Sequence, residues 1–75
     1  MIWIKYSEQK PTHGVEVIAY NESWINEDLN PRGIRVGFRT DAEEFVSAAF
    51  LKYESLEYES VFGDPTYWCE IPELQ

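Results

Sequence analysis

The chain contains few side chains of the kinds that catalyse reactions. His13 is the only histidine and Cys69 the only cysteine. A nucleophilic triad needs a nucleophile, a base and an orienting group in mutual contact. His13 lies in the segment "PTHG", which is typical of a turn, and Ser7 or Cys69 would meet it only by coincidence of folding. We therefore expect His13 to be a solvated turn residue and Cys69, flanked by Trp68 and Glu70, to be a buried, unreactive thiol.

The residue types also argue against a metal or cofactor site. One histidine and one cysteine cannot build a zinc cage from the usual nitrogen and sulfur ligands. Asn26, Asp28 and Asn30 alternate as in a calcium loop, but Pro31 replaces the glycine and Gly37 the bidentate glutamate of that loop. The sequence contains no glycine-rich phosphate cradle. We expect no cofactor and no metal, and we expect that the protein is not an enzyme.

Carboxylates dominate the second half of the chain. Residues 1–40 hold five acidic and five basic residues, whereas residues 41–75 hold nine acidic residues and a single base, Lys52, so the formal charge of −8 arises after position 40. Direct nucleic-acid binding needs a basic footprint, which this chain lacks. Acidic domains either remain soluble by self-repulsion or bind basic partners.

One acidic stretch is a candidate site for a protein partner. The segment "YESLEYES" (53–60) interleaves tyrosines with glutamates, and an aspartate follows it. Regularly spaced carboxylates on a small rigid domain can imitate a phosphate backbone, while tyrosine and tryptophan suit protein–protein interfaces. The candidate partner-binding residues are Tyr53, Glu54, Glu57, Tyr58, Glu59 and Asp64.

Short segments with the period of a β-strand must position these side chains. A turn at 10–14 and a long polar loop at 22–33 separate them. The strands are expected at 2–6, 15–20, 34–39 and 65–71. This pattern predicts a mainly β domain with one small antiparallel sheet of about four strands.

The segment 42–56 leaves two alternatives open. Asp41 and Glu44 form a helical capping box, and apolar residues recur at helical spacing, which favours a helix and an α+β domain. The same residues suit a hairpin in which 45–51 is the returning strand.

Alternation within the strands also predicts the core. In 34–39 we expect the three apolar residues to face inward and Arg35, Gly37 and Arg39 to face outward. The aromatic residues supply most of the area that so short a chain can bury. We expect Trp3 and Trp68 to meet across this core.

The chain is expected to form one domain over residues 1–75. No basic segment followed by an apolar one marks a signal peptide at its start. No apolar run reaches the roughly 18 residues that span a bilayer. With one free cysteine, these features favour the cytoplasm.

Several motifs together resemble a known family. The chain opens with Trp3-Ile4, continues with Pro11, Gly14 and "VEVIAYN", and closes with "PTYWCEIPEL". This is similar to the domain of unknown function 551 family, small bacterial and phage proteins that close with a Thr-His-Trp-Met-Pro-Leu-Pro type motif. Tyr67 stands where histidine is usual and Cys69 where methionine is usual. The resemblance favours the strand at 45–51 and implies no mechanism, since the family has no assigned function.

Two functions from different classes follow from these features. The first is a small, non-catalytic protein-binding or accessory module of bacterial or phage origin, which needs an exposed aromatic patch. The second is an acidic mimic of nucleic acid that inhibits a nucleic-acid-binding protein, which needs the acids of the second half gathered on one face.

Overall fold

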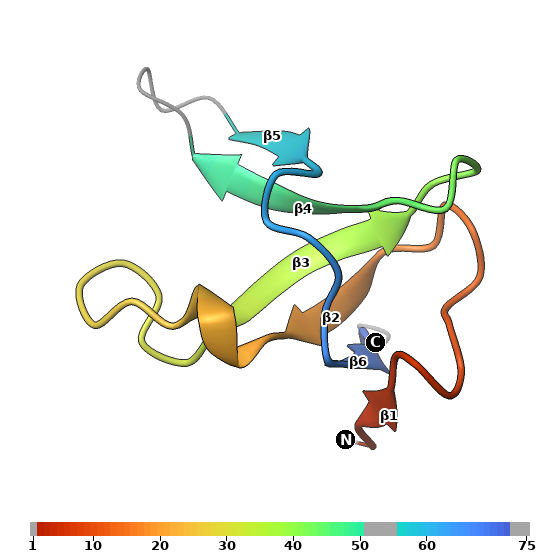
Figure 1. Cartoon of the computed structure of the whole chain (residues 1–75), viewed down its shortest axis with the longest axis horizontal. Coiled ribbons are helices and arrows are strands. Elements are labelled where there is room, and N and C mark those ends of the chain that lie inside the picture. The colour runs from red at the N-terminus through yellow and green to blue at the C-terminus, as the bar shows by residue number, and fades with distance from the viewer. Residues whose placement is uncertain (1, 51–55, 73–75) are drawn as a thin grey trace.

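One antiparallel sheet forms the framework of the molecule (Figure 1). The computed structural model describes residues 2–50 and 56–72, with side chains described for 2–48 and 60–72. Within them the strands are β1 (Ile4–Lys5), β2 (Val17–Tyr20), β3 (Ile34–Arg39), β4 (Phe45–Phe50), β5 (Leu56–Glu59) and β6 (Tyr67–Glu70). The expected mainly β, single-sheet class is confirmed, with six strands in place of about four.

The segment after β3 forms a hairpin. β4 runs antiparallel to β3 with Gly37 opposite Ser47 and Arg39 opposite Phe45. The turn between them is closed by the Thr40 N–H, which donates to the Glu44 carbonyl at 2.8 Å. Residues 45–50 are therefore a strand, and the alternative of a helix over 42–56 is wrong for the part of that segment which the structure describes.

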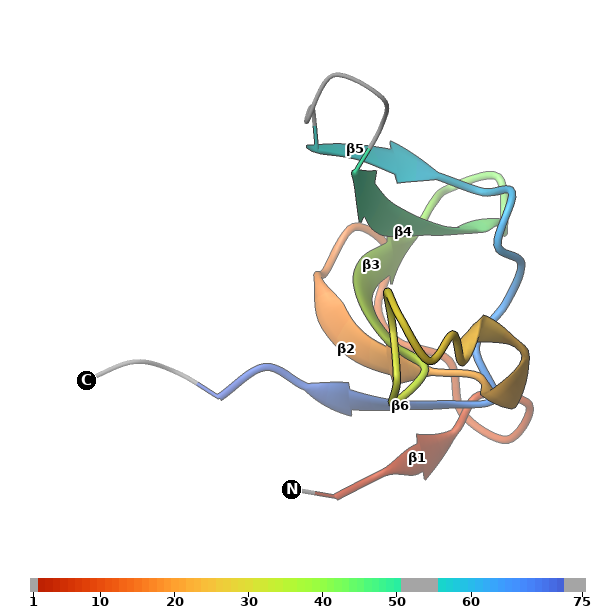
Figure 2. The ribbon, with the colours of Figure 1, turned by 90° about the vertical axis from the view of Figure 1, so that its left-hand side faces the viewer.

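The strand order departs from the chain order at β6. The sheet runs β1-β6-β2-β3-β4-β5, so β6 lies between β1 and β2. The connection 60–66 leaves β5 at one edge and crosses one face of the curved sheet to reach β6 (Figures 1 and 2). This connection covers the face on which the core forms, which we call the inner face.

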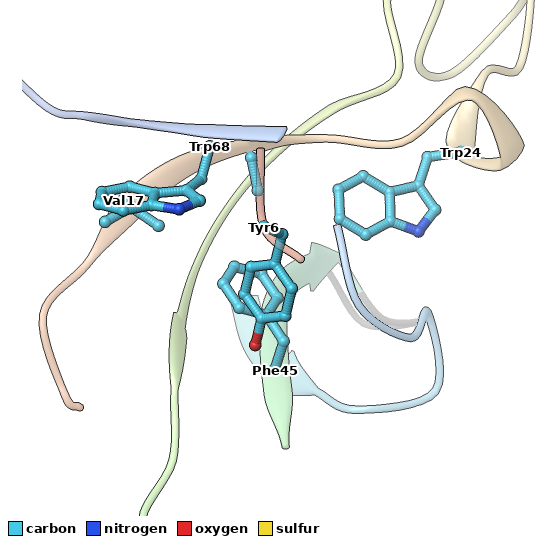
Figure 3. Close-up of a cluster of buried hydrophobic side chains, with 6 residues drawn as sticks. Tyr6, Val17, Trp24, Phe45 and Trp68 are labelled. Carbon is cyan, nitrogen blue, oxygen red and sulfur yellow. The ribbon is translucent and has the colours of Figure 1, made fainter. Parts of the chain in front are cut away.

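The core lies between the inner face and this connection. Residues directly opposite in neighbouring strands share a face, and Ala19 lies opposite both Arg35 and Trp68. Tyr6 and Phe45 meet edge to face, with ring centroids 6.0 Å apart. The cluster of buried residues comprises Tyr6, Val17, Ala19, Trp24, Phe45 and Trp68 (Figure 3).

The three tryptophans differ from the expected arrangement. Trp68 is buried as expected, and its indole Nε1–H donates to the Gln9 carbonyl at 2.7 Å. Trp3 is 42% exposed, so its assignment to the core was wrong. Trp24 takes a core position in its place, and its Nε1–H donates to the Phe62 carbonyl at 2.8 Å.

A short helical turn in the predicted loop explains the burial of Trp24. Residues Glu22–Trp24 form a 3-10 helix, labelled η1, within the segment expected to be irregular. Asn21 caps it, because its Oδ1 accepts a hydrogen bond from the Ser23 N–H at 2.8 Å. The Asn21 side-chain amide also donates to the Asp64 carbonyl at 2.8 Å, which joins the turn to the crossing connection.

The expected orientation of β3 was wrong. Gly37 lies opposite Val17 and Arg35 lies opposite Ala19, so both share the inner face with these residues. Arg39 comes two positions after Gly37 in the same strand and therefore points to the same face. In a single sheet both faces carry apolar side chains. Alternation therefore defines two faces but does not say which one forms the core.

Two features let β3 present such residues to the core. Gly37 is buried where a Cβ atom would lie 2.3 Å from the Val46 carbonyl oxygen and 2.8 Å from the Phe45 ring. The Arg35 guanidinium lies 3.6 Å from the centroid of the Phe62 ring. The Arg35 Nη1 donates to the Ala48 carbonyl, and burial lowers the pKa of this guanidinium from its ordinary value.

Candidate functional site

Three aromatic rings line a hollow on the face opposite the core, which we call the outer face. The outer hollow is lined by Trp3, Tyr20 and Tyr67 and has a volume of about 370 Å³. Trp3 precedes β1, Tyr20 ends β2 and Tyr67 begins β6, so the rings come from three neighbouring segments of the sheet.

Register explains why these rings meet. Tyr67 lies directly opposite Tyr20 on one side and Lys5 on the other. The centroids of the two tyrosine rings are 6.5 Å apart and their planes are inclined by 40°. Tyr67 is 38% exposed, so the outer hollow has accessible walls that another molecule can contact.

The outer hollow is suited to binding rather than to catalysis. Its lining is three flat, largely apolar rings with hydroxyl or indole N–H groups as polar handles. No carboxylate, histidine or thiol is among the described residues that line it. Such rings offer contact area at small cost in side-chain entropy.

Most of the predicted partner-binding residues lie outside the part of the chain whose side chains the structure describes. Tyr53 and Glu54 lie outside the described residues, and Glu57, Tyr58 and Glu59 belong to β5, where the backbone alone is described. Asp64 is exposed and lines a hollow of about 270 Å³ with Glu43 and Glu44, which we call the acidic hollow. Among the described residues, Asp64 is therefore grouped with acids of the 41–44 turn.

His13 joins two turns rather than a nucleophile. Its Nε2 lies 2.8 Å from Oε1 of Glu43, and since an ionised carboxylate only accepts, the ring nitrogen is the donor. Arg39 Nη1 donates to the other oxygen of Glu43, also at 2.8 Å. These hydrogen bonds from His13 and Arg39 lower the pKa of the Glu43 carboxyl. The cluster connects the 10–14 turn to the β3–β4 turn.

Cys69 is buried on β6. It is 1% exposed, and burial raises the pKa of its thiol. A higher pKa lowers the thiolate fraction and hence the reactivity. The position therefore agrees with the expectation of a buried thiol.

Within residues 2–50 and 56–72, no group of three His, Cys, Asp or Glu side chains is placed to hold a metal ion. No helix in this part of the chain is long and apolar enough to span a membrane. The side chains of Asn26 and Asn30, considered above as calcium ligands, hydrogen-bond to nearby backbone groups.

The outer hollow was not recognised in the sequence because its members were judged by residue type. Tryptophan is most often a core residue in a short chain, so Trp3 was assigned to the core with Trp68. Strand alternation carried a usable signal, since it places Tyr67 and Tyr20 on the faces opposite Trp68 and Ala19. The pairing of β6 with β2, which brings the two tyrosines together, is a long-range contact without a local signal.

The fold and the hollow define a class: a small single-sheet antiparallel β protein with an exposed aromatic hollow on its outer face. The chain matches no family model, no curated protein and no solved structure. The resemblance to the domain of unknown function 551 family therefore stays a prediction.

Proposed function

We propose that this protein is a small, non-catalytic module, encoded by a bacterium or a phage, that binds a protein partner through the outer hollow. The observation that carries this proposal is the exposure of Trp3 and Tyr67, which line a hollow with the half-buried Tyr20 on the face opposite the core. A buried position would have made the same rings ordinary core residues. Tyrosine and tryptophan are also the residues that dominate the energy of protein interfaces.

The surroundings of the outer hollow support a protein partner. Ile2, which precedes Trp3 in the sequence, is 81% exposed. With Trp3 and Tyr67 it gives the neighbouring β1 and β6 segments three exposed apolar side chains. Clustered apolar exposure is typical of an interaction surface, whereas scattered single residues are ordinary.

Charge supports a protein rather than a nucleic acid as the partner. The formal net charge is −8, which disfavours direct contact with a phosphate backbone. The free, buried thiol of Cys69 suits a reducing compartment, so we place this binding in the cytoplasm.

The acidic mimic of nucleic acid is a second candidate, and one observation favours it. The acidic hollow gathers the carboxylates of Glu43, Glu44 and Asp64. Glu43 is paired with Arg39, however, which neutralises part of the local field. The rings that line the outer hollow act through apolar contact, which no ion pair within the protein weakens. For that reason we favour the aromatic module.

Affinity capture with matched variants tests the proposal. Wild-type protein, Trp3→Ala and Leu29→Ala are immobilised, and host lysate proteins are retained at low salt and at about 1 M salt, where charges are screened beyond ~3 Å. Leu29 is the control because it is 86% exposed but lies in the 26–30 loop, outside the outer hollow. We expect a partner that resists salt, remains on Leu29→Ala and is lost from Trp3→Ala.

Other outcomes would contradict the aromatic module. A partner that binds Trp3→Ala as well as the wild type would remove the outer hollow from its interface. A basic partner that dissociates at high salt and fails to bind the Glu44→Gln, Asp64→Asn double variant would favour the mimic instead.

A further inference from the structure

A second hollow lies at the opposite side of β6, on the inner face. It has a volume of about 260 Å³, and we call it the inner notch. Val17 and Trp68, which are 1% and 5% exposed, belong to its lining and give it a rigid apolar base. The more exposed Val15 and Ile71 contribute apolar walls.

Two carboxylates, those of Glu16 and Glu70, give the inner notch its charge, and Glu16 already has an interaction of its own. Glu70 lies directly opposite Val17, two residues after Trp68, so it shares their face and lines the notch. Glu70 is exposed, and no described base forms an ion pair with it. Arg39, which reaches the nearby Pro11 carbonyl, is already paired with Glu43.

The β1–β6 ladder ends beside the inner notch. β1 pairs with β6 only at Tyr67 and Trp68. On the side away from β2, Cys69 and Glu70 have no strand partner among the described residues. An open sheet edge accepts an added strand, whose backbone supplies hydrogen bonds while pockets select alternate side chains.

We infer that the end of β6 binds an extended segment of a partner that carries a lysine or arginine, with the cationic side chain in the inner notch. The aliphatic stem packs on Trp68 and Ile71, and the charged head reaches the Glu70 carboxylate. Long basic side chains combine an apolar stem and a charged tip in this way. A cross-strand pair of opposite charges also stabilises an antiparallel ladder.

Charge disfavours the simplest competing occupant, a second copy of this chain. A second copy of this chain would bring another formal charge of −8 to an already acidic surface. A basic segment is attracted by the same field. The inner notch does not depend on the outer hollow, because Trp68 and Tyr67 point to opposite faces of β6.

A peptide titration tests this inference on the whole chain. The probe is a short capped peptide of alternating valine and lysine, and the control is the same peptide with acetylated lysines, which keeps the shape and removes the charge. Amide chemical shifts of the labelled protein report the site. We expect the lysine peptide to shift Val17, Cys69, Glu70 and Ile71, and the acetylated peptide to bind at least tenfold more weakly.

Variants make the test specific. Glu70→Gln keeps the size of an exposed side chain and should weaken binding of the lysine peptide about two- to fivefold, as expected for the loss of an exposed ion pair. Glu27→Gln removes another exposed carboxylate, in the 26–30 loop, and should leave the affinity unchanged. Trp3→Ala should also leave it unchanged, which separates this site from the outer hollow.

Three results would overturn the inference. The first is an absence of binding by the lysine peptide, and the second is equal binding of the acetylated peptide. The third is a loss of affinity in Trp3→Ala but not in Glu70→Gln, which would move the peptide to the outer hollow. None of these results bears on the proposed function, which the capture experiment tests separately with a natural partner and the outer hollow.

Discussion

At the scale of single residues, the three tryptophans have two different roles. Trp24 and Trp68 are buried, and each indole N–H donates to a backbone carbonyl from a distant segment. Trp3 is exposed and lines the outer hollow. Residue type alone cannot separate these roles, because the deciding factor is which face of the sheet each position occupies.

The two roles predict opposite effects on stability. Trp68→Ala should lower the free energy of unfolding by about 3–5 kcal/mol, as for other buried large aromatic residues. Trp3→Ala should change it by less than about 0.5 kcal/mol, as for ordinary surface positions. Urea denaturation of both variants measures the difference. Equal losses would mean that Trp3 also packs in the core.

Gly37 is a second residue whose role is steric. Adding a Cβ atom would place it 2.3 Å from a backbone oxygen, which no side-chain rotation relieves. We expect Gly37→Ala to lower the free energy of unfolding by at least about 1–3 kcal/mol, the usual range for overpacking. Chemical denaturation checks this value. A variant as stable as the wild type would show that β3 and β4 can separate easily at this point.

At the scale of elements, the β3–β4 turn is held by charge as well as by backbone hydrogen bonds. Glu43 has a positive φ of 63°, an uncommon conformation for a residue other than glycine. Its carboxylate accepts hydrogen bonds from His13 and Arg39. The capping box noticed in the sequence therefore lies in a hairpin turn, and the acidic residue that organises the turn is Glu43 rather than Asp41 or Glu44.

This arrangement predicts a pH dependence with a definite sign. The folded state lowers the pKa of Glu43 below its ordinary value of 4.5. Glu43 therefore adds stability above pH 4.5, and this contribution is lost as the pH falls through the lower folded-state pKa. Wild type should melt at a higher temperature than Glu43→Gln near neutral pH, and the gap should close below pH 4.5.

The control for this experiment is a carboxylate without such partners. Glu27→Gln removes an exposed carboxylate for which the described residues provide no ion pair, so its melting curve should follow the wild type across the same range. A gap between wild type and Glu43→Gln that persists unchanged well below pH 4.5 would contradict an electrostatic origin.

The crossing connection is the other element on which the core depends. Phe62 packs against the core, and its carbonyl accepts from Trp24 while its ring lies under the Arg35 guanidinium. Phe62→Ala should lower the free energy of unfolding by about 2–3 kcal/mol, less than a fully buried phenylalanine. Val61→Ala, at a neighbouring residue that is 78% exposed, should have almost no effect. Similar unfolding curves for both variants would contradict a role for the connection in the core.

At the scale of the whole molecule, period-two patterning was enough to predict the class. The strands at 15–20 and 34–39 were found because they alternate cleanly, and the strand at 45–50 was decided by a resemblance over an ambiguous local pattern. β5 was missed because its sequence is half glutamate, which is typical of a solvated segment. The orientation of β3 and the outer hollow could not be predicted, since both depend on the route of the 60–66 connection, a long-range feature.

The placement of β6 between β1 and β2 has a consequence for how the chain acquires its structure. From β2 to β5 each strand pairs with the next one in sequence, and these pairings can form early, whereas β1 has no partner and β2 lacks its second partner until β6 arrives. Pairings between segments so distant in sequence form slowly. Until then the outer edge of β2 is unpaired, and such an edge invites aggregation or capture by a chaperone. The arrival of β6 therefore determines when the edge of β2 is protected from aggregation.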